Sequence, residues 1–115
     1  MATLKHLTNK DFDLNIQNAG TPVLVDFYAD WCGPCKALAP TLEAVAEEQA
    51  ANLAVVKVDI DENPDLATRF NIQSIPTLII FEGGEAKKTL KGLLPKRALL
   101  DELAPFLAKA AVVVS

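Results

Sequence analysis

The chain has 115 residues, half of them apolar, and a formal net charge of −4. This length supports one hydrophobic core and is too short for two, so we expect a single domain over residues 1–115. Nucleic acid is not an expected partner, because the 11 basic residues are scattered among 15 acidic ones. No stretch is apolar for long enough to cross a bilayer, and a membrane is not an expected partner either.

The first elements expected along the chain are a short helix and a buried strand. Thr8 and Asp11 have the spacing of a helix cap and its first-turn acid, and Gly20 is a stop signal. Residues 1–10 lack the continuous apolar core of a secretory signal, so the expected location is the cytoplasm. The run Val23 to Ala29 is mostly apolar without alternation, which is typical of a strand covered on both faces.

The middle of the chain predicts a helix, a strand and a second short helix. Apolar residues recur at helical spacing from the cysteines to about Ala51, and Leu53 to Ile60 is a second buried strand. Asn63 is a cap residue and Pro64 fits the first helical position, so a short helix to about Phe70 is expected.

The last third predicts a hairpin and a final helix. Thr77 to Phe81 is a strand, and a tight turn at Gly83-Gly84 leads to Ala86 to Lys91, whose charges mark an edge strand. An amphipathic helix follows from Pro95, and Pro105 is expected to bend it or end it early.

This order of elements predicts an α/β fold with a central mixed sheet of four to five strands, flanked by helices on both faces. The folded core is expected over about residues 8–108. Residues 109–115, mainly Ala110 to Ser115, are expected to form a frayed tail.

The only two cysteines, Cys32 and Cys35, lie between the first long strand and its helix, where open α/β sheets place their sites. Thiols at this spacing can close into a disulfide and reopen, which suits a reversible redox couple. The start of a helix stabilises a thiolate, and Lys36 adds a cation, so Cys32 is expected to be an ionised, solvent-accessible nucleophile. Cys35, one turn further along the helix, is expected to be shielded and to resolve the intermediate.

The residues around the cysteines are expected to contact a partner. Gly33 allows close approach of another chain, and Pro34 fits the first helical turn because it needs no N–H there. Trp31 is interpreted as an apolar contact at the rim rather than a core filler.

Two other uses of a cysteine pair with this spacing are a metal site and a structural disulfide. A Cys-x-x-Cys pair is half of a tetrahedral zinc site, but His6 is the only other soft ligand, which leaves the set incomplete. A purely structural disulfide is also less favoured, because so short a loop constrains the unfolded chain little.

Asp26 and Lys57 are charged residues inside otherwise apolar strands, and they could approach each other across neighbouring strands. One interpretation is a structural salt bridge. The other is that desolvation raises the pKa of Asp26, which then exchanges a proton with Cys35 through water. The residues alone leave both open.

Together these residues resemble the thioredoxin family. The segment Trp31-Cys32-Gly33-Pro34-Cys35-Lys36 is identical to the family's active-site motif, and the resemblance runs from about Thr8 to Ala108. Single residues elsewhere also match the family's pattern, namely Asp26, Pro40, Lys57, Pro76, Gly84 and Gly92.

The resemblance implies the thioredoxin fold and reduction of disulfides in protein substrates, with Cys32 attacking, Cys35 resolving and Asp26 assisting proton transfer. It implies no bound cofactor beyond the redox-active disulfide, a flavin-dependent thioredoxin reductase as electron donor, and a monomer. Sequence alone favours a trans bond before Pro76. The resemblance implies a cis bond there, with Pro76 against the cysteines, and an Ile75 backbone that pairs with an extended substrate segment.

Two residues depart from the family pattern: Tyr28, where many members have a second tryptophan, and Lys91, before Gly92, which replaces a residue that is commonly apolar at the rim of the docking surface.

Two functions compete with that of a reductase. Oxidases and isomerases of this kind usually place histidine between the cysteines, whereas Gly33-Pro34 favours a reductant. A binding module that clamps a partner without turnover is the third hypothesis.

Overall fold

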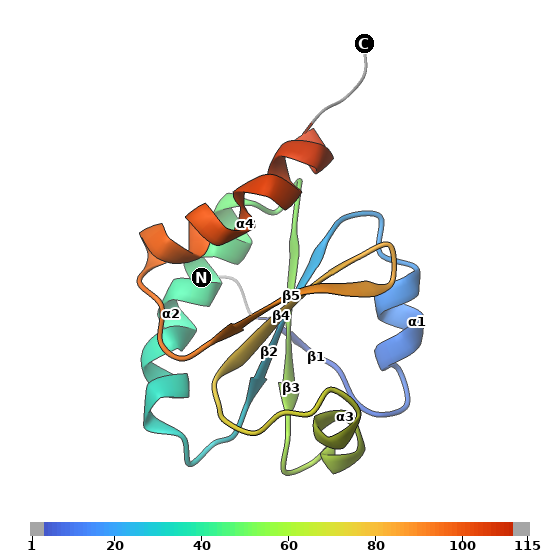
Figure 1. The fold of residues 1–115 in the computed structure, drawn as a ribbon, viewed down its shortest axis with the longest axis vertical. Helices are drawn as coiled ribbons and strands as arrows, with labels where there is room; N and C mark the ends of the chain where they lie inside the picture. Colours follow the sequence, from blue (N-terminus) through green and yellow to red (C-terminus); the bar gives the residue numbers. More distant parts are fainter. Residues whose placement is uncertain (1–3, 112–115) are drawn as a thin grey trace.

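The computed structural model describes residues 4–111, with side chains described as far as residue 107. Its elements alternate between strands and helices until a final hairpin and helix, as the sequence predicts (Figure 1). In chain order they are β1 (Lys5–His6), α1 (Phe12–Gln17), β2 (Val23–Tyr28), α2 (Gly33–Glu48), β3 (Ala54–Asp59), α3 (Pro64–Arg69), β4 (Thr77–Glu82), β5 (Glu85–Lys91) and α4 (Lys96–Ala111).

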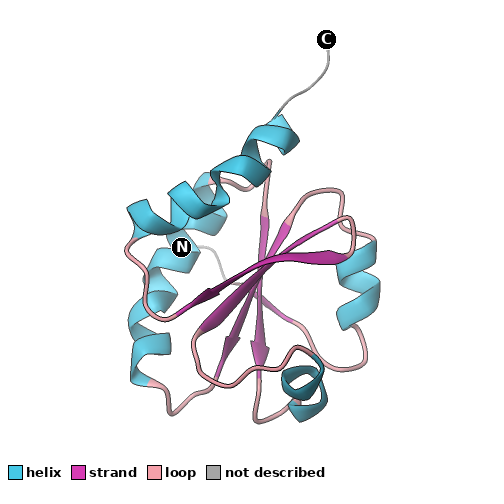
Figure 2. Ribbon diagram, viewed as in Figure 1, coloured by secondary structure: helices cyan, strands magenta, loops and turns pink. Residues whose placement is uncertain are grey.

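The strands form one five-stranded mixed sheet in the order β1-β3-β2-β4-β5. β1 and β2 each pair in parallel with β3, whereas β4 is antiparallel to both β2 and β5. The turn between β4 and β5 has positive φ at Gly83 and Gly84, as a tight hairpin turn requires. The central strand β2 therefore has hydrogen-bonded neighbours on both sides (Figure 2).

Helices cover both faces of the sheet, which confirms the predicted fold class. α2 and α4 lie on one face and α1 and α3 on the other (Figure 1). Side chains alternate along β2: Leu24 packs with Leu38 and Leu99 of α2 and α4, whereas Val25 packs with Phe12 of α1. This alternation places Asp26 and Tyr28 on the α2 side.

Three boundaries differ from the prediction. β1 was not predicted, because it has only two residues and no apolar run of its own. Helix α1 begins at Phe12 instead of directly after Thr8, since residues 8–11 form a turn in which Asp11 accepts the Thr8 N–H at 2.7 Å. Helix α4 continues through Pro105 instead of ending there.

The continuation of α4 has a packing reason. A proline inside a helix removes one hydrogen bond and costs about 3 kcal/mol. Leu103 before Pro105 is fully buried, and Phe106 and Leu107 after it pack against the same core, so this burial offsets the loss. Helix α4 includes Ala110 and Ala111 of the predicted tail, and residues 112–115 lie outside the described residues. Within residues 4–111, no helix has the length and apolar character that a membrane span needs.

Candidate active site

The two cysteines lie where β2 gives way to α2. Cys32 is the N-cap of this 16-residue helix and forms a disulfide with Cys35, the Cα atoms being 5.2 Å apart. The Cys35 N–H points back along the helix and donates a hydrogen bond to Cys32 Sγ at 3.2 Å. Pro34 lies in the first turn, where its missing N–H leaves no intrahelical bond unmade. The predicted position of the sulfurs at a helix start is confirmed.

The prediction that Cys32 is solvent-accessible is wrong for this disulfide form. Cys32 and Cys35 are each only 4% exposed, and they pack in a small cluster with Tyr28 and Ile75. The cause is Ile75, whose carbonyl oxygen lies 3.7 Å from Cys32 Sγ and covers it from the loop before β4. Cys35 is shielded as predicted. A reacting thiolate therefore has to approach along the edge formed by Ile75.

The other motif residues are exposed around this edge. Gly33 and Pro34 are exposed at the helix start, and Trp31 is 70% exposed, so it does not fill the core. The indole N–H of Trp31 donates a 2.9 Å hydrogen bond to Asp61 Oδ2, which fixes the ring's direction. Beside it lies a hollow of about 260 Å³, lined by Trp31, Ile60, Ile72, Gln73, Ser74 and Ile75.

The Ile75-Pro76 peptide bond is cis, as the resemblance implies. Pro76 is buried, and its carbonyl oxygen accepts a 3.0 Å hydrogen bond from the N–H of Gly92. Gly92 has φ of +88° and follows β5, so this hydrogen bond joins the loop after β5 to the loop that covers the disulfide. It is Ile75, the residue before the proline, whose carbonyl oxygen contacts Cys32.

Asp26 is a carboxyl buried in the middle of β2. It is 1% exposed, and neither carboxylate oxygen has a hydrogen-bond partner among the described residues. Burial raises the pKa of Asp26 from 3.8 to about 6, and the positive charge of Lys57 acts in the opposite direction. This carboxyl therefore changes its protonation state near neutral pH.

Lys57 is the register partner of Asp26 on β3, as expected, but the two form no direct salt bridge in the described part of the chain. Its Nζ lies 4.2 Å from the ring centroid of Tyr28 instead. The Tyr28 hydroxyl makes a 3.1 Å hydrogen bond with His6 Nδ1, and burial, followed by nearby carboxylates, raises the pKa of Tyr28 to about 12. Tyr28 and His6 were missed as site residues. The i+2 spacing of Tyr28 from Asp26 places both on one face of the strand, but it does not predict the contacts of Tyr28 with Lys57 and His6.

A small hollow of about 110 Å³ reaches the buried side of the disulfide. Its lining includes Cys35, Tyr28 and Lys57. This volume is sufficient for water molecules, and the polar groups around it supply hydrogen-bond partners.

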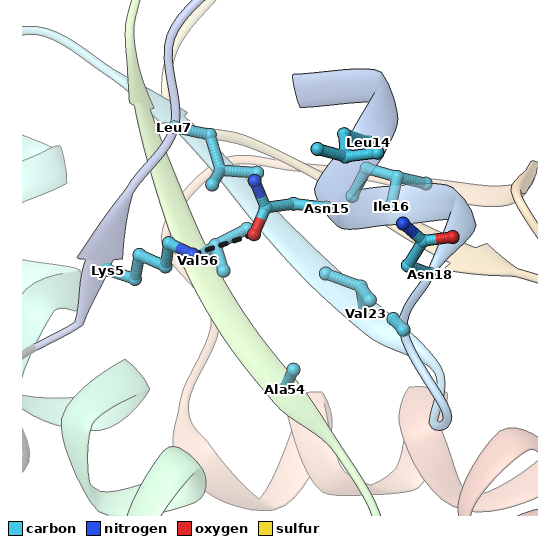
Figure 3. A pocket seen from close by; sticks show the side chains of 10 residues that line it. Lys5, Leu7, Leu14, Asn15, Ile16, Asn18, Val23, Ala54 and Val56 are labelled. Atoms are coloured by element: carbon cyan, nitrogen blue, oxygen red, sulfur yellow. Dashed lines mark hydrogen bonds between the residues drawn. The ribbon is translucent and has the colours of Figure 1, made fainter. Parts of the chain in front are cut away.

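A larger hollow of about 430 Å³ lies between α1, β1 and β3, where Lys5 Nζ donates a 2.7 Å hydrogen bond to Asn15 Oδ1 (Figure 3). Its other walls are mainly apolar, and it contains neither cysteine, so it is not the redox site. Among the described residues, no group of three potential ligands (His, Cys, Asp or Glu) could hold a metal ion.

Comparison with known proteins gives a consistent result. The family model described as thioredoxin matches residues 3–105. Thioredoxin of Mycobacterium bovis is 49% identical over 102 residues, which cover 89% of this chain and 87% of that protein. Thioredoxin of Streptomyces clavuligerus is 46% identical over 84% of this chain and 90% of that protein. The bifunctional thioredoxin reductase/thioredoxin of Mycobacterium leprae is 47% identical over 84% of this chain and 21% of its own length.

A disulfide between Cys32 and Cys35 at the start of a helix, on this mixed sheet, defines a thiol–disulfide oxidoreductase that works by dithiol exchange. The sequence comparisons identify the family within this class. The chain belongs to the thioredoxin family.

Proposed function

We propose that the chain reduces disulfides in protein substrates, with Cys32 as the nucleophile and Cys35 as the resolving thiol. In the reduced protein, the Cys32 thiolate attacks a substrate disulfide, which forms a mixed disulfide and releases one substrate thiolate. Cys35 then loses its proton and attacks Cys32 Sγ. This step releases the second substrate thiolate and leaves the Cys32–Cys35 disulfide, so two electrons pass to the substrate.

The observation that carries these roles is the position of Cys32 at the N-cap. Its sulfur accepts the Cys35 N–H at 3.2 Å and lies at the positive end of the α2 dipole, and both effects favour a thiolate. Cys35 lies inside the first turn, so its sulfur is placed to attack Cys32 and not an incoming chain.

Asp26 is proposed to accept the proton of Cys35 through water. Its pKa of about 6 means that it is mostly a carboxylate at neutral pH and still basic enough to take a proton. The hollow lined by Cys35 and Lys57 has room for water beside the thiol, and Lys57, the register partner of Asp26, would stabilise the carboxylate. The proposed role of Lys57 is therefore electrostatic.

The substrate segment is proposed to lie along the exposed rim of the disulfide. Ile75 would pair through its backbone with an extended chain, and the apolar hollow beside Trp31 would accept a side chain of that segment. The remaining residues proposed to contact substrate are Gly33, Pro34, Pro76 and Gly92.

The proposed electron donor is a flavin-dependent thioredoxin reductase. The Mycobacterium leprae relative, which is named as a bifunctional thioredoxin reductase/thioredoxin, supports this partner. We further propose that the chain acts as a monomeric single domain in the cytoplasm, where thiols are kept reduced. Neither nucleic acid nor a membrane is a proposed partner.

Trapping of the mixed disulfide tests the two cysteine roles. Cys35→Ser should accumulate a covalent complex with insulin that dithiothreitol releases, whereas Cys32→Ser should form none. The wild type should accelerate insulin precipitation by dithiothreitol. A complex formed by Cys32→Ser and not by Cys35→Ser would reverse the assignment, and retention of biological function by the double serine variant would indicate a binding module.

A further inference from the structure

Four side chains on the α2 face of the sheet form a continuous row from solvent to the buried carboxyl. His6 on β1 and Asp26 on β2 are both register partners of Lys57 on β3, so Lys57 lies between them. Tyr28 lies two residues beyond Asp26 on the same face. The row therefore joins an exposed imidazole to a carboxyl that is 1% exposed.

Within this row, Lys57 contacts the aromatic ring and not the carboxylate. Register partners on parallel strands lie side by side, which would allow an ion pair between Lys57 and Asp26. The ammonium instead lies 4.2 Å from the Tyr28 ring centroid, a favourable cation–π distance, and neither Asp26 oxygen has a hydrogen-bond partner in the described part of the chain. The ring thus competes with the carboxylate for the same cation.

Tyr28 is itself held in place at its far end. Its hydroxyl lies 3.1 Å from His6 Nδ1, and the two rings meet edge to face with centroids 5.8 Å apart. A phenol is both donor and acceptor, so neutral or charged imidazole can make this bond. Only 8% of Tyr28 is exposed, which leaves the ring little freedom to turn away from Lys57.

We propose that Tyr28, anchored by His6, is a positioning residue that keeps Lys57 from forming an ion pair with Asp26. The inference rests on the proposed proton-transfer role of Asp26 and gives it a structural cause. A direct ion pair would stabilise the carboxylate and make it a weaker base. While Lys57 stays on the Tyr28 ring, Asp26 is a stronger base than it would be in that ion pair.

Other charged groups also lie around this row. Burial raises the pKa of Asp26, and the positive charge of Lys57 lowers it. Lys36 and Asp30 line the hollow that Lys57 also lines. Besides burial, four carboxylates raise the pKa of Tyr28, namely Asp59, Asp30, Glu62 and Asp26.

The test is a ¹³C NMR titration of the Asp26 carboxyl in the full oxidised chain between pH 4 and 9. Tyr28→Leu removes the ring and should lower the pKa of Asp26 by about one unit, the low end for a newly adjacent cation. His6→Ala alters only an exposed side chain and should give a smaller shift in the same direction. An unchanged or raised pKa in both variants overturns the proposal.

Two controls separate the ion pair from other effects. In a Lys57→Met background, Tyr28→Leu should no longer lower the pKa, and an equal drop there would assign the effect to hydration and overturn the proposal. Phe81→Leu, an aromatic truncation on the opposite face of the sheet, should leave the titration unchanged. The titration needs no turnover, so it fails or succeeds independently of the catalytic role. If the pKa moves but the pH profile of insulin reduction does not, positioning stands and the role of Asp26 is wrong.

Discussion

Gly92 donates its backbone N–H to the carbonyl oxygen of Pro76 at 3.0 Å, which ties the loop after β5 to the loop that covers the disulfide. Gly92 has φ of +88°, a conformation that side chains with a Cβ atom rarely adopt. The hydrogen bond and the glycine therefore depend on each other. A residue that shifts this backbone would also shift the peptide next to Ile75.

Gly92→Ala is expected to lower the free energy of unfolding by about 1 kcal/mol, because alanine at this φ is strained. Apart from its two chain neighbours, no described residue has a heavy atom within 4 Å of the added Cβ, so the loss comes from the backbone conformation. Urea unfolding measures it. Gly20→Ala is the matched control: it has equal space and no positive φ, and it should change stability by less than about 0.5 kcal/mol. Equal losses in both variants would contradict the backbone argument.

Asp26→Ala is expected to raise stability at neutral and alkaline pH. The pKa of Asp26 is about 6 in the folded protein and 3.8 without burial. Between these pH values the folded state therefore binds more protons than the unfolded state. Stability therefore falls as pH rises through that window, by up to about 3 kcal/mol at pH 7 and above. Urea unfolding at pH 4 and pH 8 should show the advantage of Asp26→Ala growing with pH. A difference that is constant with pH would contradict this account.

Asp26→Ala should also slow insulin reduction at neutral pH, by about tenfold, below the usual range for general acid–base catalysis because the carboxyl acts through water. The wild-type rate should rise with pH through an inflection near 6, the pKa of Asp26. The variant should lose this inflection. An unchanged rate and profile would return Asp26 to a purely structural role.

Asp59 provides the opposite case of a buried carboxyl. It is 8% exposed, but its Oδ1 accepts the N–H groups of Asp61 and Glu62 at 2.8 and 3.3 Å. Asp59→Ala leaves these donors without a partner and should lower the free energy of unfolding by about 1–2 kcal/mol. Asp59→Asn keeps an acceptor and should lose less. If Asp59→Ala were stabilising, the contrast with Asp26 would fail.

The sequence was sufficient to predict the long strands, the helix at the cysteines and the hairpin, because each has a strong local signal. The apolar run before the cysteines required a strand covered on both faces, and β2 is buried throughout. β1 was beyond such reasoning, since Lys5 and His6 become a strand only by pairing with Val56 and Lys57 of β3. The path of α4 through Pro105 likewise depends on tertiary packing and not on local propensity.

At the site, residues with unusual chemistry for their position could be identified, whereas contacts between side chains could not. Asp26 and Lys57 stood out as charges in apolar strands, and their pairing in register is confirmed. The cation of Lys57 over Tyr28, and the bond from Tyr28 to His6, join three strands in space and have no trace in local spacing. The cover over Cys32 arises in the same way, because Ile75 reaches it from a loop distant in the sequence.

Trp31→Ala is expected to weaken substrate docking and leave stability nearly unchanged. The ring is 70% exposed, so its loss should change the free energy of unfolding by less than about 0.5 kcal/mol. An exposed indole beside an apolar hollow is typical of an interface anchor, and its truncation should raise KM for insulin about tenfold, with kcat little changed. Trp31→Phe keeps an aromatic ring but loses the hydrogen bond to Asp61, so its KM should lie between those of the wild type and Trp31→Ala.

Leu14→Ala is the matched control for Trp31→Ala, because Leu14 is 65% exposed on α1, a helix on the face opposite α2. Its truncation removes a similarly exposed apolar side chain and should leave both KM and kcat unchanged. Steady-state kinetics with insulin at several concentrations separates the two parameters. A fall in kcat at constant KM in Trp31→Ala would mean that the indole acts on the exchange step at the disulfide, and the docking role would have to be withdrawn.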